Sequence, residues 1–394
     1  MVKLNANLKN LKKNYLFVDV QNKTKEYISE NPNARLISMG IGDVTLPLSP
    51  VITKAMQDAA TEMSDSKTFH GYGPYEGYEF LREAISKKYL DYGVKIKSEE
   101  VYVSDGAKSD SANILDILSP DSTVLITDPV YPVYLDSSIM GGYKIKYVDA
   151  NKDNGFLPLP YEGLKADIIY LCSPNNPTGA VYNKTQLKKW VDFANDNNSL
   201  IIFDAAYEAF IEGNDLPHSI FEIEGSRKCA VELCSFSKSA GFTGIRCAYA
   251  VIPEELKVGS ESLGKVWLRR QSIKFNGVSY ITQKAALASL SPEGREETLK
   301  CINYYKRNAR VLSGAIEKLG FWYTGGENSP YIWFKGPQGM NSWELFDCLL
   351  KKANIVSTPG SGFGSNGEGF IRLSSFGSYE NTLCAAQRLS GLKF

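Results

Sequence analysis

Histidine is nearly absent from the 394-residue sequence, which contains only His70 and His218, in unrelated contexts. So few histidines exclude histidine-rich zinc sites and argue against a Ser-His-Asp triad. The seven cysteines include no Cys-x-x-Cys pair and lie mostly in apolar stretches, which suits reduced thiols better than a disulfide framework. We therefore expect no metal centre. We also expect a cytoplasmic location, or a plastid one if a transit peptide has been removed.

Net charge and long apolar runs are missing as well. Lys plus Arg and Asp plus Glu both number 44, so the formal net charge is zero and no global field draws the chain to nucleic acid. No apolar run approaches the ~20 residues that span a bilayer. We therefore expect neither nucleic-acid nor membrane partners, and an enzyme of two domains at the usual ~100–200 residues per domain.

Short apolar runs alternate with helix-period segments in the middle of the chain, as in a parallel sheet wrapped by helices. The predicted strands cover residues 124–126, 168–171, 200–203 and 231–234. Apolar residues at helical spacing predict a helix over 302–316, and two later strands are predicted at 331–334 and 370–373. We predict an α/β fold with a large domain at residues 48–290. Residues 1–47 and 291–394 would form an amino-terminal arm and a smaller α+β domain.

One loop combines a lysine with hydroxyls and an arginine. In the segment 235–238, Ser235 and Ser237 precede Lys238, and Arg246 follows in the same glycine-rich stretch. A lysine amine can condense with the aldehyde of pyridoxal phosphate, while hydroxyls and a guanidinium hold the phosphate. Lysines in such loops are common, however, so a plain surface loop is the alternative.

Two strand ends supply partners for this lysine. Asp204 directly follows the apolar run 200–203, and Asn176 lies in the turn Ser-Pro-Asn-Asn-Pro-Thr-Gly at 173–179. Ligands of open α/β sheets bind at the carboxyl ends of strands. There Asp204 would pair with the pyridinium nitrogen, and the Asn176 amide would reach a ring oxygen or a carboxylate. A helix cap for Asp204 and an ordinary polar turn around Asn176 are the alternatives.

A strand-to-helix turn upstream offers a phosphate site. The segment 104–108, Ser-Asp-Gly-Ala-Lys, follows the apolar run 101–103 and precedes a helix predicted at 111–118. Free N–H groups at a helix start bind anions, and glycine lets the backbone approach closely. Tyr131 is the ring expected to stack on the cofactor, with packing in the core as the alternative.

The order of these motifs resembles the fold-type I aminotransferases over nearly the whole chain. The resemblance implies a mostly parallel seven-stranded sheet between helices, pyridoxal phosphate as cofactor, and Lys238, Asp204 and Tyr131 as catalytic residues. It also implies that Arg372 binds the substrate α-carboxylate, which suits a planar guanidinium, although a surface charge on an edge strand is the alternative. The implied cofactor contacts are Tyr72, Ala107, Lys108, Tyr131, Asn176, Asp204, Tyr207, Ser235, Ser237, Lys238, Arg246 and Asn276.

A narrower resemblance, to the LL-diaminopimelate aminotransferases, comes from Asn14-Tyr15, the segments 40–43 and 70–73, and Lys108. Diaminopimelate has two amino-acid ends, so an enzyme specific for it needs groups for the far ammonium and carboxylate. A homodimer with shared active sites is implied, in which Tyr72 and Asn276 reach across the interface. The implied substrate contacts are Tyr15, Gly42, Tyr72, Lys108, Tyr131, Asn176, Asn276 and Arg372. An aromatic of the arm and a turn glycine are the alternatives for Tyr15 and Gly42.

One position departs from that family, which usually has an acid three residues after Tyr72. Here Tyr75 takes that place and the acid follows at Glu76, which puts the strictness of substrate choice in doubt. We expect transamination between LL-2,6-diaminopimelate and 2-oxoglutarate, giving tetrahydrodipicolinate and glutamate in lysine biosynthesis. The alternatives are a broader aromatic or alanine aminotransferase, and a regulatory domain that binds the cofactor without turnover.

Overall fold

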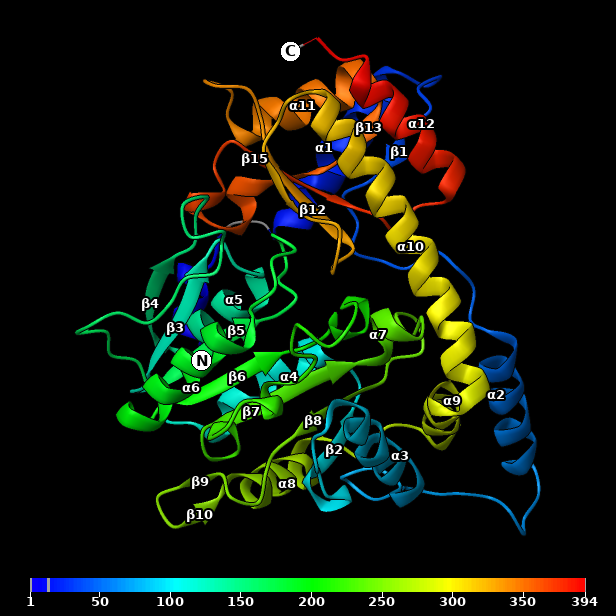
Figure 1. Cartoon of the computed structure of the whole chain (residues 1–394). Coiled ribbons are helices and arrows are strands. Elements are labelled where there is room, and N and C mark those ends of the chain that lie inside the picture. Colours follow the sequence, from blue (N-terminus) through cyan, green and yellow to red (C-terminus); the bar gives the residue numbers. More distant parts are fainter. Residues whose placement is uncertain (1, 13–14, 394) are drawn as a thin grey trace.

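Seven strands form the larger sheet, in the order β2-β8-β7-β6-β5-β3-β4 (Figure 1). The computed structural model describes residues 2–12 and 15–393. The strands are β2 (Val101–Ser104), β3 (Thr123–Asp128), β4 (Lys144–Asp149), β5 (Ile168–Cys172), β6 (Leu200–Asp204), β7 (Ala230–Ser235) and β8 (Ala248–Val251). Only β8 is antiparallel to its neighbours β2 and β7, whereas the other pairs are parallel. The carboxyl ends of β5, β6 and β7 therefore meet at one edge.

Helices cover both faces of this sheet. They are α2 (Pro50–Glu62), α3 (Glu79–Tyr89), α4 (Ala107–Asn113), α5 (Pro132–Gly141), α6 (Lys184–Asn197), α7 (Phe236–Ser239), α8 (Leu263–Lys274) and α9 (Tyr280–Leu290). On β6, Ile201 and Phe203 pack in the core that α3, α6 and α9 share, whereas Leu200 and Ile202 pack in the core of α5 and α8. Alternate side chains of a strand point to opposite faces, so burial on both faces explains the continuous apolar runs.

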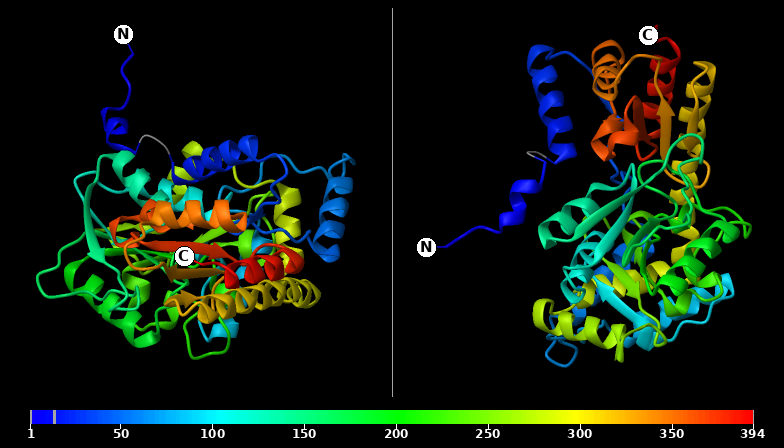
Figure 2. Two further views of the ribbon diagram at one scale, coloured as in Figure 1. Left: turned by 90° about the horizontal axis from the view of Figure 1, so that it is seen from above. Right: turned by 90° about the vertical axis from the view of Figure 1, so that its left-hand side faces the viewer.

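Four antiparallel strands form the smaller sheet, in the order β11-β12-β15-β14. They are β11 (Tyr323–Gly325), β12 (Tyr331–Lys335), β14 (Thr358–Pro359) and β15 (Phe370–Ser374), with α1 (Leu16–Glu30), α10 (Pro292–Lys318), α11 (Ser342–Ala353) and α12 (Tyr379–Ser390). Two short pairs complete the fold: β1 (Ile37–Ser38) beside β13 (Ile355–Val356), and β9 (Lys257–Val258) beside β10 (Glu261–Ser262). Figure 2 shows α1 beside the smaller sheet, with the amino-terminal arm extending away from it.

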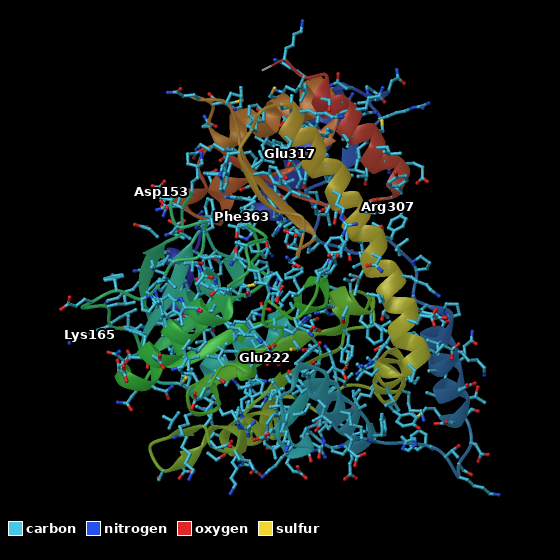
Figure 3. All side chains as sticks on the ribbon, viewed as in Figure 1. Asp153, Lys165, Glu222, Arg307, Glu317 and Phe363 are labelled. Carbon is cyan, nitrogen blue, oxygen red and sulfur yellow. The ribbon has the colours of Figure 1, made fainter. Side chains whose placement is uncertain are left out.

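Contacts between the parts that carry the two sheets fix how they face one another. The Val130 N–H donates to the Phe363 carbonyl at 2.8 Å, and the Ser365 N–H donates to the Asp128 carboxylate at 3.1 Å. Figure 3 labels Phe363 at this junction, and it labels Arg307 on the long helix α10. The guanidinium of Arg307 lies 3.7 Å from the centre of the Tyr379 ring, which ties α10 to α12.

The predicted α/β fold is confirmed. The four predicted central strands are β3, β5, β6 and β7, the two later strands are β12 and β15, and the helix predicted at 302–316 lies within α10. The helix predicted at 111–118 begins earlier, at Ala107, and ends in a 3-10 turn over Ile114–Ile117. The domain bounds at residues 48–290 stay a prediction. Within residues 2–12 and 15–393, no helix combines the length and apolar character needed to cross a membrane.

Candidate active site

The carboxyl ends of β5, β6 and β7 and the start of α4 enclose a cavity of about 310 Å³, hereafter the inner cavity. Open parallel sheets bind ligands at this edge. The lining residues are Asp43, Ala107, Lys108, Tyr131, Tyr134, Cys172, Asn176, Asp204, Ala206, Tyr207, Ser235, Ser237, Lys238, Thr243 and Arg246. The structure thus brings together every predicted cofactor contact except Tyr72 and Asn276.

Asp204 is the buried acid of the inner cavity. One carboxylate oxygen accepts the Ala206 N–H at 2.9 Å, and the other accepts the Tyr134 hydroxyl at 2.5 Å. Burial raises the pKa of Asp204, and these two hydrogen bonds oppose that rise. Asp204 therefore stabilises the turn after β6 and faces the cavity, but the N-cap of the following 3-10 helix is Tyr207, so the alternative of a helix cap is wrong. A buried carboxylate in this place suits a cationic ring nitrogen.

Lys238 lies on the short helix α7, whose start is capped by the Ser235 hydroxyl, which accepts the Ser237 N–H at 3.1 Å. The Lys238 ammonium donates to the Gly42 carbonyl. Burial lowers the pKa of Lys238 to about 8. Since only the free amine attacks an aldehyde, this shift makes Lys238 a competent nucleophile near neutral pH.

Arg246 and Gly106 build an anion cradle opposite Lys238. A Cβ at position 106 would lie 2.2 Å from Nη2 of Arg246, so glycine lets the guanidinium sit directly against the backbone of this turn. Arg246 itself has a φ of 62°, a region that costs free energy for a residue with a side chain. Its Nη1 donates to the Ser237 hydroxyl at 3.4 Å. With the free N–H groups at the start of α4, these donors suit a phosphate.

Arg372 is fully buried, with 1% of its surface exposed. It lies on β15, which has a neighbour on each side, so the alternative of an edge-strand surface charge is wrong. Its guanidinium donates to the Asn176 side-chain oxygen and to the Gly40 carbonyl, both at 2.7 Å. Neither acceptor is charged, and Nε has no acceptor among the described residues. The positive charge of Arg372 therefore has only neutral acceptors among the described residues, and a carboxylate ligand would supply the missing negative charge.

A second cavity of about 820 Å³, hereafter the outer cavity, adjoins the inner one. The two share Asp43, Tyr131, Asn176, Tyr207 and Lys238, and Arg372 lines the outer cavity together with residues of α1. A molecule in the outer cavity can therefore contact Arg372 and Lys238 at once. Gly42 also lines the outer cavity, where a Cβ would lie 2.5 Å from the Tyr331 hydroxyl.

Two tyrosines at the wall of both cavities have distinct surroundings. Tyr131 is half-buried and immediately precedes α5; it lines both cavities and also packs against the core on that side of the sheet, as the alternative held. Tyr207 is buried, and its hydroxyl lies 2.7 Å from that of Tyr331. Burial raises the pKa of both Tyr131 and Tyr207, so both hydroxyls stay protonated and can donate hydrogen bonds at neutral pH.

Lys108 lines the inner cavity, whereas the neighbouring Tyr15 lines neither the inner nor the outer cavity but a separate one of about 710 Å³. The Lys108 ammonium is 5.2 Å from the centre of the Tyr15 ring, a favourable cation–π geometry. Lys108 is exposed and Tyr15 is half-buried directly before α1. Asn14, the other residue of that motif, lies outside the described residues.

The remaining predicted contacts, Tyr72 and Asn276, are exposed and line neither cavity of this chain. Tyr72 has 90% of its surface exposed, which is unusual for an aromatic side chain. Glu76 also lies outside both cavities, and burial together with the nearby Glu76 carboxylate raises the pKa of Tyr102, on β2, to about 12. Tyr72 and Asn276 are therefore exposed, whereas Glu76 is half-buried next to β2 of its own chain.

Sequence reasoning missed two residues of the site. Tyr134 donates to Asp204, and Tyr331 contacts both Tyr207 and the Arg372 guanidinium, whose carbon lies 4.4 Å from the centre of the Tyr331 ring. Tyr134 has a local signal, because it follows Tyr131 by three residues at the start of α5. Tyr331 comes from the smaller sheet, and nothing in its local sequence distinguishes it from a core tyrosine.

Comparisons with known proteins agree with this geometry. A family model described as aminotransferase class I and II matches residues 34–389. LL-diaminopimelate aminotransferases of Methanosphaera stadtmanae and of Prochlorococcus marinus strain NATL2A are each 51% identical, and each alignment covers all of both chains. The solved structure of the L,L-diaminopimelate aminotransferase from Chlamydomonas reinhardtii superposes with a TM-score of 0.93 at 42% identity, covering 98% of each chain. The chain belongs to the class I and II aminotransferases.

Proposed function

We propose that this chain transfers an amino group from LL-2,6-diaminopimelate to 2-oxoglutarate with pyridoxal phosphate as cofactor. The products are tetrahydrodipicolinate and glutamate, in lysine biosynthesis. The observation that carries the proposal is the buried, uncompensated guanidinium of Arg372 in a cavity shared with Lys238. This pair suits an amino acid held by its carboxylate beside the lysine. The names of full-length relatives at 51% identity support the choice of diaminopimelate.

The inner cavity fits pyridoxal phosphate on the chemistry of its groups. Asp204 offers a carboxylate to the ring nitrogen, Arg246 and Ser237 offer donors to the phosphate, and Lys238 offers an amine of lowered pKa to the aldehyde. Asn176 and Tyr207 line the same cavity and would hydrogen-bond the ring oxygen. When bound, pyridoxal phosphate supplies an aldehyde that carries the amino group and a ring that accepts the electrons left at the substrate Cα.

Lys238 is the residue that moves the proton. With pyridoxal phosphate bound, the free Nζ of Lys238 would serve as the base that takes the proton from the substrate Cα and as the acid that gives it back. Asp204 would hold a proton on the ring nitrogen, and Arg372 would orient the substrate by its α-carboxylate. The oxo acid runs the same steps in reverse, so one set of residues serves both half-reactions.

The second amino-acid end of diaminopimelate needs its own contacts. Lys108, exposed beside Tyr15, carries the positive charge for the far carboxylate. With a monocarboxylate such as alanine, the only carboxylate binds Arg372 and none is left for Lys108 to bind. The family pattern has an acid for the far ammonium at the position of Tyr75, whereas in this chain the acid follows one residue later, at Glu76. This departure favours a second candidate, a broader aromatic or alanine aminotransferase.

A homodimer is part of the proposal. Phe69, Tyr72, Tyr75 and Ile273 leave between 42% and 90% of their surface exposed, an apolar set that favours coverage by a second copy. Tyr72 and Asn276 would then complete the partner's site. Mixing Tyr72→Ala chains with Lys238→Ala chains tests this, because restored activity requires sites built from two chains. The cytoplasmic location stays a prediction.

Purified protein, loaded with the cofactor, tests the reaction directly. LL-diaminopimelate, meso-diaminopimelate, alanine and phenylalanine are added separately while the yellow absorbance of the bound cofactor is followed, with Lys238→Ala as the blank. We expect fast bleaching by LL-diaminopimelate that 2-oxoglutarate reverses. Equal bleaching by alanine or phenylalanine would favour the broader aminotransferase, and no bleaching by any amine would contradict transamination.

A further inference from the structure

A buried charged cluster lies behind the cofactor-binding residues and has no part in the proposed reaction. It consists of Lys88 on α3, Tyr92, Glu208 and His218, hereafter the Glu208 cluster. The Glu208 carboxylate accepts the Lys88 ammonium at 2.5 Å and the Tyr92 hydroxyl at 3.0 Å, and it lies 3.8 Å from His218 Nδ1. The rings of Tyr92 and His218 stack at 4.7 Å between their centres. Glu208 is 6% exposed.

The cluster is ionised in the folded protein. Burial alone would raise the pKa of Glu208, but the ammonium of Lys88 and the nearby His218 ring hold it at about 2. Three further titratable groups adjoin it: Tyr249 on β8, and Cys234 and Glu232 on β7. Burial raises the pKa of Tyr249 and of Cys234, so both are neutral near neutral pH. Burial raises the pKa of Glu232 to about 7. A buried ion pair is a poor source of net stability, because apolar residues of the same size would replace it at no loss. Its position therefore needs another reason.

That position is the turn that carries Tyr207. Glu208 directly follows Tyr207, and the Glu208 N–H donates to the Ala205 carbonyl at 3.0 Å, which closes the turn just after Asp204. The two neighbours face different cavities: Tyr207 lines the inner cavity, whereas Glu208 lines a cavity of about 270 Å³ with Lys88 and His218. Ser235 and Ser239, which flank Lys238, line this rear cavity too.

Glu208 thus fixes the backbone of a turn whose other side presents a hydroxyl to the cofactor. From the far end, Lys306 on α10 holds the same segment by donating to the Phe210 carbonyl at 2.7 Å. We propose that Glu208, anchored by Lys88 and Tyr92, is a positioning residue that sets where the Tyr207 hydroxyl lies relative to the ring oxygen of the cofactor. The inference rests on the proposed function, because it assumes that Tyr207 hydrogen-bonds that oxygen.

The pH titration of the bound cofactor's absorbance reports on that hydrogen bond and is insensitive to packing elsewhere. Glu208→Gln alone would leave Lys88 buried and unpaired, so the test uses the double variant Lys88→Met/Glu208→Gln, which removes both charges. It is compared with the parent, with Tyr207→Phe and with the triple variant. Asp116→Asn is the control, since Asp116 also accepts ion pairs, from Arg270 and Lys274, but lies away from this turn.

The double variant is expected to bind the cofactor and to shift the spectroscopic pKa in the direction of Tyr207→Phe. It should lower kcat about tenfold with little change in KM, because a misplaced group costs rate more than binding. The triple variant should match Tyr207→Phe, since the two changes act on one interaction. A double variant with the parent's spectroscopic pKa would overturn the inference while leaving the proposed function intact. An unchanged spectroscopic pKa in Tyr207→Phe would overturn the role of Tyr207 itself, and the inference with it.

Discussion

The inner end of the site and its outer end are built in different ways. Asp204, Asn176 and Arg372 are buried; Asp204 and Arg372 lie on strands, and Asn176 lies in the turn that follows β5. Lys108, Tyr72 and Asn276 are exposed, and the last two do not reach a cavity of their own chain.

This contrast separates chemistry from choice of substrate. Strand ends in a packed sheet are held within narrow limits, as proton transfer and charge pairing require. Loops and a second copy can vary without disturbing the sheet. Changes at the inner end should therefore slow the reaction for every amine, whereas changes at outer positions that face only the far end of the substrate, such as Lys108, should mainly alter the ratio between amines.

The largest effect is expected from Asp204→Asn. An amide cannot keep the ring nitrogen protonated, so kcat should fall by about 10²–10³-fold, as for other preorganised electrostatic groups. The fall should be equal for LL-diaminopimelate and alanine in steady-state assays. A loss confined to diaminopimelate would break the division between the two ends.

Arg372→Lys should come next. An ammonium replaces two parallel hydrogen bonds by one, and a hydrogen bond to a charged group is worth about 1.5–3 kcal/mol, so KM for any amino acid should rise about 10- to 100-fold. KM is measured for diaminopimelate and alanine side by side, with kcat as the internal reference. An unchanged KM would show that the α-carboxylate binds elsewhere.

Uptake of the cofactor by the apo protein should depend on pH through Lys238. The pKa of Lys238 is about 8, below its ordinary value, so the free amine increases as the pH rises through 8. The uptake rate at pH 7 should be about tenfold below its plateau, since roughly one lysine in ten is then unprotonated. Stopped-flow absorbance across pH 6–10 measures it, with Tyr75→Phe as an outer-end control of unchanged midpoint. A flat profile would contradict a free-amine requirement.

The smallest effect is expected at the outer end, from Tyr75→Glu. An acid at this exposed position would pair with the far ammonium and should raise the preference for LL-diaminopimelate over alanine about twofold to fivefold, as surface ion pairs do. Tyr75→Gln is the uncharged control. If Glu76→Gln alone abolished the preference, Glu76 would already make this contact, and the loop would present it differently from the family pattern.

Local patterns in the sequence predicted the inner end better than the outer end. The motifs around Asp204, Asn176 and Lys238 each adjoin a strand of one parallel sheet, so topology alone brings them together. Tyr331 escaped prediction because it reaches Tyr207 from another sheet, and no local pattern encodes that packing. Tyr72 and Asn276 were named by resemblance alone, since a single chain cannot show what a partner contributes. The start of α4 was misplaced because Gly106 is the N-cap residue, so the helix begins at Ala107, directly after the turn.

The guanidinium of Arg372, which has no ion-pair partner among the described residues, has a practical consequence at the bench. The carboxylate groups of acetate, citrate or succinate in a buffer offer it the same two oxygens as the α-carboxylate of an amino acid. Such ions bind only the folded state, so they raise the melting temperature and compete with substrate at the same time. Kinetic constants measured in carboxylate buffers will therefore understate affinity, and a thermal-shift screen of buffer anions should rank them by their fit to this one side chain.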